Sequence, residues 1–447
     1  MKEKTNGFYW LKSGFLTIMQ NMAGVLFGFG GFYLLVRVLS KHDFGVWTLY
    51  MSAITILEIV RSGLVQNGLI KFISGTESSE HPRIVSASFV ISGGLTLVCI
   101  VLNLTLAPWL AGLWKSPELV HMLYAFNVMY ILSGILSQFN CIEQANLNYS
   151  GVFASSFVRQ ALFFLYVLIC FLTKHELNLT NLVYMQIVAA FVSLLVAGYY
   201  VRQHLSFKFS LSVDWIKKLF HYGKYAFGTS VSSILSGTID QMMLGALLSP
   251  VASAAFNVAV RIINLVDIPT NALATIVFPQ SAKRLETEGP GAVKYLYEKS
   301  VGTILAIFIP GLFFIFFFSG YVVEFIAGGK YADTVPLLRI TVFYCLLIPF
   351  GRQCGTVLDS AGKTKTTFSI VLFTASLNLA MNYFFIRRFG VIGAAYATLL
   401  SNIVGFAAGQ LVLYRELKVN AANTLIYALQ FYPEFINKYL KQIVARK

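Results

Sequence analysis

Long apolar segments separated by short polar ones recur along almost the whole chain, from residue 14 to residue 414. Each segment is long enough to supply the roughly 20 residues that a helix needs to cross a bilayer. Segments with the alternation of a half-buried strand are absent. The pattern therefore predicts an all-α polytopic membrane protein with about 12 transmembrane helices, at 14–38, 44–72, 84–113, 119–141, 151–173, 180–201, 222–247, 251–279, 297–319, 336–358, 366–386 and 390–414.

Two stretches of the chain repeat one another. Residues 39–50 (LSKHDFGVWTLY) align with residues 248–259 (LSPVASAAFNVA), and the same shift places Asp267 on Glu58. A second pair of stretches follows the fourth and the tenth apolar segments and places Asp359 on Glu143. Six segments in each half give both halves the same orientation. We therefore expect two six-helix lobes related by a pseudo-twofold axis along the membrane normal.

Polar segments between the apolar runs set the expected domain boundaries. We expect an N-terminal six-helix lobe at 1–203, a cytoplasmic amphipathic linker at 204–221, a C-terminal six-helix lobe at 222–415, and a cytoplasmic interfacial helix and tail at 416–447. In both the linker and the tail, apolar residues recur at helical spacing opposite charged ones. This pattern is typical of helices that lie in the headgroup plane of a membrane.

Composition and charge agree with a membrane protein. Only 12% of the residues are charged and 57% are hydrophobic, with a mean hydropathy of +0.70, which excludes a soluble globular protein of this length. With twelve spans, 22 of the 34 lysines and arginines fall on the side of the two termini and seven on the other side. Both termini are therefore expected to be cytoplasmic. The net charge of +15 then reflects topology and contact with anionic membrane lipids, and nucleic acid is not an expected partner.

Four short stretches resemble the oligosaccharide flippases of bacterial polysaccharide synthesis (Wzx-type), within the multidrug/oligosaccharidyl-lipid/polysaccharide exporter superfamily. They are LSKHDFGVW at 39–47, DQMMLGALLS at 240–249, AFNVAVRI at 255–262 and FGVIGAAYAT at 389–398, and the similarity covers about residues 8–415. One departure is that the lipid II flippases of this superfamily typically have two further C-terminal spans, where this chain has the expected interfacial helix.

The resemblance implies a transporter of the bacterial cytoplasmic (inner) membrane. Such a flippase translocates an undecaprenyl-pyrophosphate-linked oligosaccharide by alternating access, for the biosynthesis of O-antigen or capsule. The partners that it implies are the undecaprenyl-linked oligosaccharide, membrane lipids and other polysaccharide-assembly proteins.

Charged residues inside the apolar segments are the first candidates for function, because each costs on the order of 3 kcal/mol at the bilayer centre. Arginine suits the recognition of phosphates and carboxylates. We therefore expect a substrate-binding cavity that is lined by arginines at four positions, Arg61, Arg159, Arg261 and Arg352. Three carboxylates are candidates for coupling transport to H⁺ or Na⁺, namely Glu58, Asp240 and Asp267.

A structural role is the alternative for each of these residues. Intra-bundle ion pairs fix helix register, and Glu58 and Arg61 are the strongest candidates because their i,i+3 spacing puts them on one helix face. The amides of Asn378 and Asn382 either bond sugar hydroxyls or bridge helices, and the sequence leaves both interpretations open.

Other functions remain as alternatives. A cation-coupled multidrug exporter of the same superfamily is the main one, although a cavity for organic cations should be mainly acidic. A membrane enzyme of polysaccharide assembly typically needs a sizeable outer loop, and the longest one here, near 320–335, is short. Catalytic residues, cofactors and a metal site are not expected. The cysteines are scattered, the histidines lack metal-ligand spacing, and the KTKT stretch at 363–366 lacks the glycine pattern of a P-loop.

Overall fold

The computed structural model describes residues 2–205, 210 and 212–444, and every regular element in this part of the chain is a helix. The prediction of an all-α membrane protein is confirmed. The helices are α1 (Lys2–Val38), α2 (Lys41–Ser62), α3 (Gln66–Gly75), α4 (His81–Leu113), α5 (Glu118–Ala145), α6 (Tyr149–Thr173), α7 (Leu179–Val201), α8 (Val213–Leu247), α9 (Pro250–Thr287), α10 (Pro290–Phe317), α11 (Ser319–Ala327), the 3₁₀ helix η1 (Gly329–Thr334), α12 (Val335–Cys345), α13 (Ile348–Ser360), α14 (Thr364–Phe389), α15 (Val391–Leu417) and α16 (Ala421–Val444).

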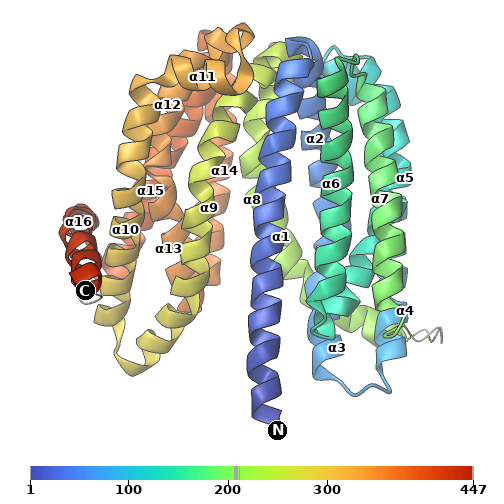
Figure 1. Ribbon diagram of the computed structural model, residues 1–447, viewed down its shortest axis with the longest axis horizontal. Helices are drawn as coiled ribbons and strands as arrows, with labels where there is room; N and C mark the ends of the chain where they lie inside the picture. The colour runs from blue at the N-terminus through green and yellow to red at the C-terminus, as the bar shows by residue number, and fades with distance from the viewer. Residues whose placement is uncertain (1, 206–209, 211, 445–447) are drawn as a thin grey trace. The chain divides into compact units, whose positions relative to one another are not determined.

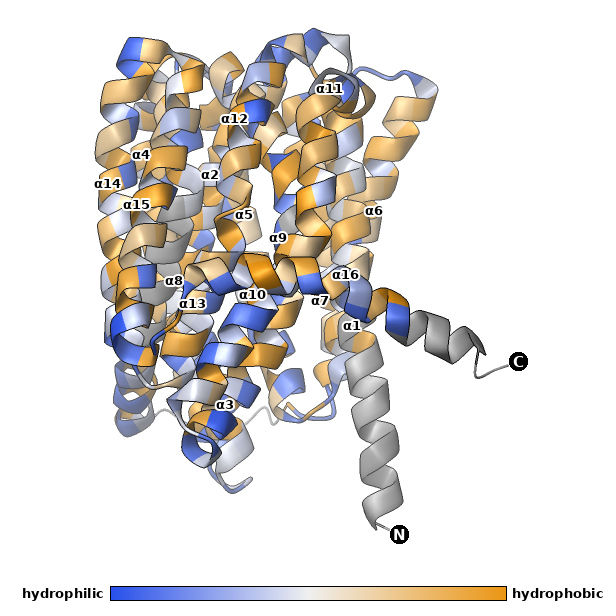
Figure 2. Ribbon diagram, turned by 90° about the vertical axis from the view of Figure 1, so that its left-hand side faces the viewer, coloured by the Kyte–Doolittle hydropathy of each residue, from blue (hydrophilic) through white to orange (hydrophobic). Residues whose placement is uncertain are grey.

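Most of the predicted spans are recovered as long apolar helices. Among the described residues, nine helical segments are long and apolar enough to cross a membrane, or ten if the two halves of α9 form one bent span. The apolar part of α1, Met22–Val38, is shorter. Figure 2 shows hydrophobic residues along the length of helices such as α6 and α15. The protein is therefore a multi-pass membrane protein, while the count of twelve spans stays a prediction.

The chain divides into two compact units. Unit 1 consists of Met1–Leu235 with Ser249–Val251, and unit 2 consists of Ser236–Leu248 with Ala252–Lys447. The division falls inside α8, so this helix contributes to both units. The lobe boundaries expected at residues 203 and 222 stay a prediction.

In unit 1, α1, α6, α7 and α5 lie side by side in this order (Figure 1), and α2, α3 and α4 pack on α5. The helix α2, which contains the first copy of the repeated stretch, begins at an N-cap residue, Ser40. Ser40 accepts a hydrogen bond on its Oγ from the backbone N–H of Asp43 at 3.0 Å, which satisfies one of the free amides at a helix N-terminus. The sequence LSKHD thus encodes a helix start, which is a structural reason for this motif.

The predicted second span is recovered as Lys41–Gly75, with a short turn inside it. α2 ends at Ser62 and α3 starts at Gln66, and the turn between them is contacted by the first part of α8. Leu219 of α8 is fully buried against Gly68 of α3. Both lie in unit 1, so this packing belongs to its core.

The predicted amphipathic linker at 204–221 is described only in part, and its bounds stay a prediction. Residues 206–209 and 211 lie outside the described residues, and the segment from Val213 onward forms the first turns of the long helix α8. Trp215 donates its indole N–H to Glu80 at 2.7 Å, and this hydrogen bond lowers the pKa of the Glu80 carboxyl. Trp215 and Leu219 of this segment therefore pack against the protein, whereas Phe220 is exposed.

In unit 2, α14 and α15 form an antiparallel pair, and α10 packs against α13 and α16. Figure 2 shows α16 lying across α10. The start of α16 is held by Glu298 of α10, which accepts hydrogen bonds from the Asn420 backbone at 2.8 Å and from Asn423 Nδ2 at 3.0 Å. The other side of α16 is apolar and exposed at Leu425, Leu429 and Ile436. A C-terminal amphipathic helix is thus present, and its place at a membrane surface stays a prediction.

The outer loop expected near 320–335 is not irregular. It contains α11 and η1, which continue almost directly into α12. Gly328, with φ at +82°, separates α11 from η1 by adopting a left-handed conformation that L side chains rarely adopt.

Candidate functional site

A charged cluster in unit 1 lies where α2 meets α5. Arg61 donates to Glu58 Oε2 from Nη2 at 2.6 Å and from Nε at 3.1 Å, so the i,i+3 pair expected from the sequence is formed. The other carboxylate oxygen, Oε1, accepts a hydrogen bond from Ser133 of α5 at 2.7 Å. The Arg61 side chain is only 3% exposed and that of Glu58 is 26% exposed. The pair is therefore embedded in the unit but has an opening on the carboxylate side.

The guanidinium of Arg61 fits closely against α5. A Cβ atom added at Gly134 would lie 3.4 Å from Arg61 Nη1, so the cation packs closely against α5 at this position. Nη1 itself is buried and has no hydrogen-bond partner among the described residues. Arg159 of α6 lies within electrostatic range of Glu58. Unit 1 thus brings together three of the predicted residues, and two arginines against one carboxylate leave one net positive charge.

A second ion pair lies within unit 2. Arg352 of α13 donates from Nη2 to Asp267 Oδ2 of α9 at 3.0 Å, with side chains 44% and 30% exposed. Asp267 is the first residue of the second half of α9, where the helix bends by 44°. Arg261 lies exposed on the first half of α9. The structure therefore pairs two of the predicted residues, Asp267 and Arg352, and leaves Arg261 outside that pair.

Asp240 of α8 lies in a different, buried polar cluster of unit 2. Its Oδ1 accepts a hydrogen bond from Asn382 Nδ2 of α14, and its Oδ2 accepts one from Thr398 of α15 at 2.9 Å. Asn382 also donates to Asn378 at 3.0 Å, and Asn378 donates to Ser401 at 3.2 Å. Both asparagines therefore bridge helices. No ion pair of the described residues includes Asp240, so neutral donors alone surround its carboxylate.

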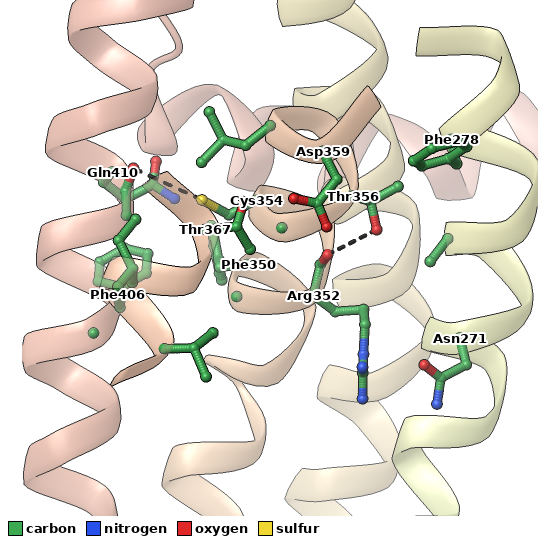
Figure 3. A pocket seen from close by; sticks show the side chains of 18 of the residues that line it. Asn271, Phe278, Phe350, Arg352, Cys354, Thr356, Asp359, Thr367, Phe406 and Gln410 are labelled. Atoms are coloured by element: carbon green, nitrogen blue, oxygen red, sulfur yellow. Dashed lines mark hydrogen bonds between the residues drawn. The ribbon is translucent and has the colours of Figure 1, made fainter. Parts of the chain in front are cut away.

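Unit 2 also contains a partly open cavity of about 680 Å³ between α9, α13, α14 and α15 (Figure 3). Arg352 lines it at one end, where its side chain points away from Asp359. Most of the remaining lining is apolar, with polar side chains from each of the four helices. The sequence did not predict this cavity, because its residues come from four segments that are far apart in the chain.

A buried acidic residue in unit 1 was not among the site predictions. Glu143, near the end of α5, is 1% exposed, and neither carboxylate oxygen has a hydrogen-bond partner among the residues described. His204 Nε2 lies 3.8 Å from Glu143 Oε1. The repeat alignment of Glu143 with Asp359 was the signal that could have drawn attention to it, because Asp359 Oδ1 is also buried without a partner.

Comparison with known proteins identifies the family. The family model described as "Polysaccharide biosynthesis protein" matches residues 34–336, which is more than half of the chain. The chain belongs to this family. The resemblance inferred from the four short stretches is thereby confirmed at the level of the family.

Individual proteins are also similar to this chain. The lipopolysaccharide biosynthesis protein WzxC of Escherichia coli (strain K12) is 21% identical over 401 residues, which cover 88% of this chain and 79% of WzxC. The solved structure of the lipid II flippase MurJ in an inward closed conformation has a TM-score of 0.75 at 14% identity, covering 96% of this chain and 93% of MurJ.

A multidrug transporter of the MATE family has the same fold. Its inward-facing structure matches with a TM-score of 0.68 at 17% identity, over 88% of this chain and 94% of the transporter. At these identities the structural likeness shows the fold alone. The fold is thus common to a lipid II flippase and a drug transporter, and the choice of substrate must come from the site.

Proposed function

We propose that this protein is a flippase that moves an undecaprenyl-pyrophosphate-linked oligosaccharide across the bacterial cytoplasmic membrane by alternating access, for O-antigen or capsule biosynthesis. The observation that carries the proposal is membership of the polysaccharide biosynthesis family on a multi-pass helical fold shared with a lipid II flippase. Both termini would then be cytoplasmic, as the distribution of lysine and arginine predicts.

The charge of the cluster in unit 1 supports an anionic substrate. Glu58 neutralises one of the two arginines, Arg61 and Arg159, so the cluster keeps one net positive charge. An arginine donor in a low-dielectric setting binds phosphate oxygens strongly. Arg61 and Arg159 are therefore our candidates for contact with the pyrophosphate, and Arg261, which is exposed on α9, for contact with acidic sugars.

The function is tested by mass spectrometry of undecaprenyl-linked glycans in a deletion strain of the source bacterium. We expect one lipid-linked oligosaccharide to accumulate and to be inaccessible to a membrane-impermeant periplasmic glycosidase. Expression of the gene from a plasmid in the deletion strain should remove the accumulated oligosaccharide. If no glycan accumulates and the strain instead becomes sensitive to cationic compounds, the drug-exporter alternative is correct.

We further propose that Asp240 binds the coupling ion, Na⁺ or H⁺. Asp240 is 7% exposed, and its carboxylate receives hydrogen bonds from Asn382 and Thr398, with no cation paired to it among the described residues. A buried carboxylate surrounded by neutral groups is stabilised by taking up a cation or a proton. Side-chain oxygens of the same cluster, such as that of Thr398, are hard ligands of the kind that an alkali cation prefers.

Asp240→Asn is expected to remove ion coupling while leaving the fold intact, because the amide keeps the size and one acceptor of the carboxylate. In purified wild-type protein, Na⁺ should raise Tm relative to K⁺, and the variant should lose this effect. If the ion is H⁺, Tm of the wild type should depend on pH more steeply than Tm of the variant. Asp214→Asn, an exposed position on the same helix, is the control. An unchanged Na⁺ and pH response in Asp240→Asn would show that the ion binds elsewhere.

A further inference from the structure

The cavity within unit 2 has unmatched polar atoms on three different helices (Figure 3). Asp359 Oδ1 on α13, Thr367 Oγ1 on α14 and Gln410 Oε1 on α15 are all buried, and none has a hydrogen-bond partner in the described part of the chain. A buried polar atom without a partner costs about 1–3 kcal/mol. All three residues line the cavity, so small rotations of their side chains would bring these atoms to a ligand that donates hydrogen bonds.

The orientation of Gln410 is fixed by its neighbours. The hydroxyl of Tyr297 donates to the backbone oxygen of Phe350 at 3.4 Å, which leaves the Tyr297 oxygen to accept the Gln410 amide N–H at 2.7 Å. The carbonyl oxygen of Gln410 is therefore the free end of the amide. Together with the carboxylate of Asp359 it gives the cavity an excess of acceptors.

The remaining lining is apolar and partly aromatic. Phe278 of α9 and Phe406 of α15 lie on opposite sides of the cavity in Figure 3, and Phe350 packs against Phe406 with ring centroids 4.9 Å apart. Apolar and aromatic walls with a few placed polar groups are the usual composition of a small-molecule site. A sugar ring matches such walls, because its C–H faces are apolar and the hydroxyls at its edge donate hydrogen bonds.

Charge narrows the choice of ligand. Of the side chains that line the described cavity, Arg352 is the cationic one, and it is bonded to Asp267 at 3.0 Å. Asp359 adds a second carboxylate, so Asp267, Arg352 and Asp359 together carry a net charge of −1. A phosphate is disfavoured by this charge, and an alkyl chain would leave the three acceptors unmatched. A neutral saccharide satisfies them.

We propose that this cavity is a saccharide-binding site that seats one or two neutral sugar residues of the transported glycan. The proposal rests on the proposed flippase function and adds to it where the sugar is held. The volume of about 680 Å³ lies within the roughly 300–1,000 Å³ of small-molecule sites. The site is formed within unit 2 alone and is separate from the Asp240 cluster.

The first test fills the cavity. Gly351 lines it, and a Cβ atom added there would meet nothing within 4 Å, so the side chain of Gly351→Leu starts in open space. Gly311→Leu in α10 is the matched control, because its Cβ also meets nothing within 4 Å and it lies outside the cavity. Binding of cellobiose and of N,N′-diacetylchitobiose to the full-length protein in lipid nanodiscs is measured by saturation-transfer difference NMR.

We expect at least one disaccharide to bind the wild type and the Gly311→Leu control, and Gly351→Leu to lose the signal. Thr367→Val should weaken binding by about 3- to 10-fold, the effect of one lost hydrogen bond, while its Tm stays the same or rises. The rise in Tm would follow because the variant removes a buried hydroxyl that has no partner in the empty protein. Tm thus separates a binding defect from a folding defect.

Three results would overturn the proposal. One is that neither disaccharide binds the wild type, which would mean that the cavity holds water alone. Another is that the wild type binds tetraphenylphosphonium instead of the disaccharides and that Gly351→Leu abolishes this binding, which would make the cavity an organic-cation site. The third is equal disaccharide binding by Gly351→Leu and the control. Flipping of lipid-linked glycan by reconstituted wild-type protein is measured separately. Absence of disaccharide binding therefore does not contradict the proposed function, and absence of flipping does not contradict disaccharide binding in the cavity.

Discussion

Replacing Arg61 with alanine is expected to destabilise unit 1 by about 3 kcal/mol, the lower part of the range for breaking a buried ion pair. The alanine leaves Glu58 with Ser133 as its hydrogen-bonding side chain and creates a cavity beside Gly134. For a unit of this size, the loss corresponds to a fall in Tm of about 6–12 °C. Thermal unfolding of the purified protein measures it.

A matched surface pair provides the control. Arg83 and Glu80 have the same i,i+3 spacing and a contact of 2.8 Å, but their side chains are 53% and 34% exposed. Exposed pairs contribute about 0–1 kcal/mol, so Arg83→Ala should lower Tm much less than Arg61→Ala. Equal losses for the two variants would show that burial of the Glu58–Arg61 pair does not matter.

A double variant separates the structural from the functional role of this pair. Glu58→Gln combined with Arg61→Met removes both charges and keeps similar volumes, so most of the lost stability should return. If Arg61 also binds the anionic substrate, glycan export in the deletion strain should stay defective although the protein is stable. Full export by the double variant would show that the pair is purely structural.

Patterns that are local in the chain predicted this fold well. Apolar run length identified the helices, and i,i+3 spacing predicted the Glu58–Arg61 contact, because both depend only on neighbours along one helix. The packing partner of an amphipathic face could not be predicted in this way. The periodicity around Trp215 and Leu219 fits a membrane surface and a protein surface equally, and the structure places both side chains against unit 1.

The sequence repeat predicted which charged residues occupy equivalent positions, but not which residues they pair with. Asp267 occupies the position of Glu58, but the residue that corresponds to Arg61 is Thr270, so α9 cannot form the same i,i+3 pair. Asp267 instead pairs with Arg352, which comes from another helix. Likewise, the sequence indicated that Asp240 is buried but not that Asn382 and Thr398 surround it. Contacts between distant segments depend on packing, which one sequence does not reveal.

Gly223→Ala is expected to be the most disruptive small substitution in the chain's first unit. A Cβ atom at this position would lie 1.8 Å from the backbone oxygen of Leu64 and 2.7 Å from its carbonyl carbon. A clash with backbone cannot be relieved by a rotamer change, so α8 must move away from the turn between α2 and α3. Overpacking of this kind costs about 1–3 kcal/mol or more. The yield of folded protein and its Tm should both fall.

Gly237 of the same helix provides the matched control for Gly223→Ala. A Cβ atom there would meet nothing within 4 Å, so Gly237→Ala should be neutral or stabilising by about 0.5–1 kcal/mol, because alanine favours a helix interior. The two variants make the same chemical change on one helix, and their opposite signs would therefore isolate the contact with Leu64. A Gly223→Ala protein with wild-type yield and Tm would mean that α8 does not approach Leu64 as closely as described. In that case the close packing of α8 on the α2–α3 turn would have to be abandoned.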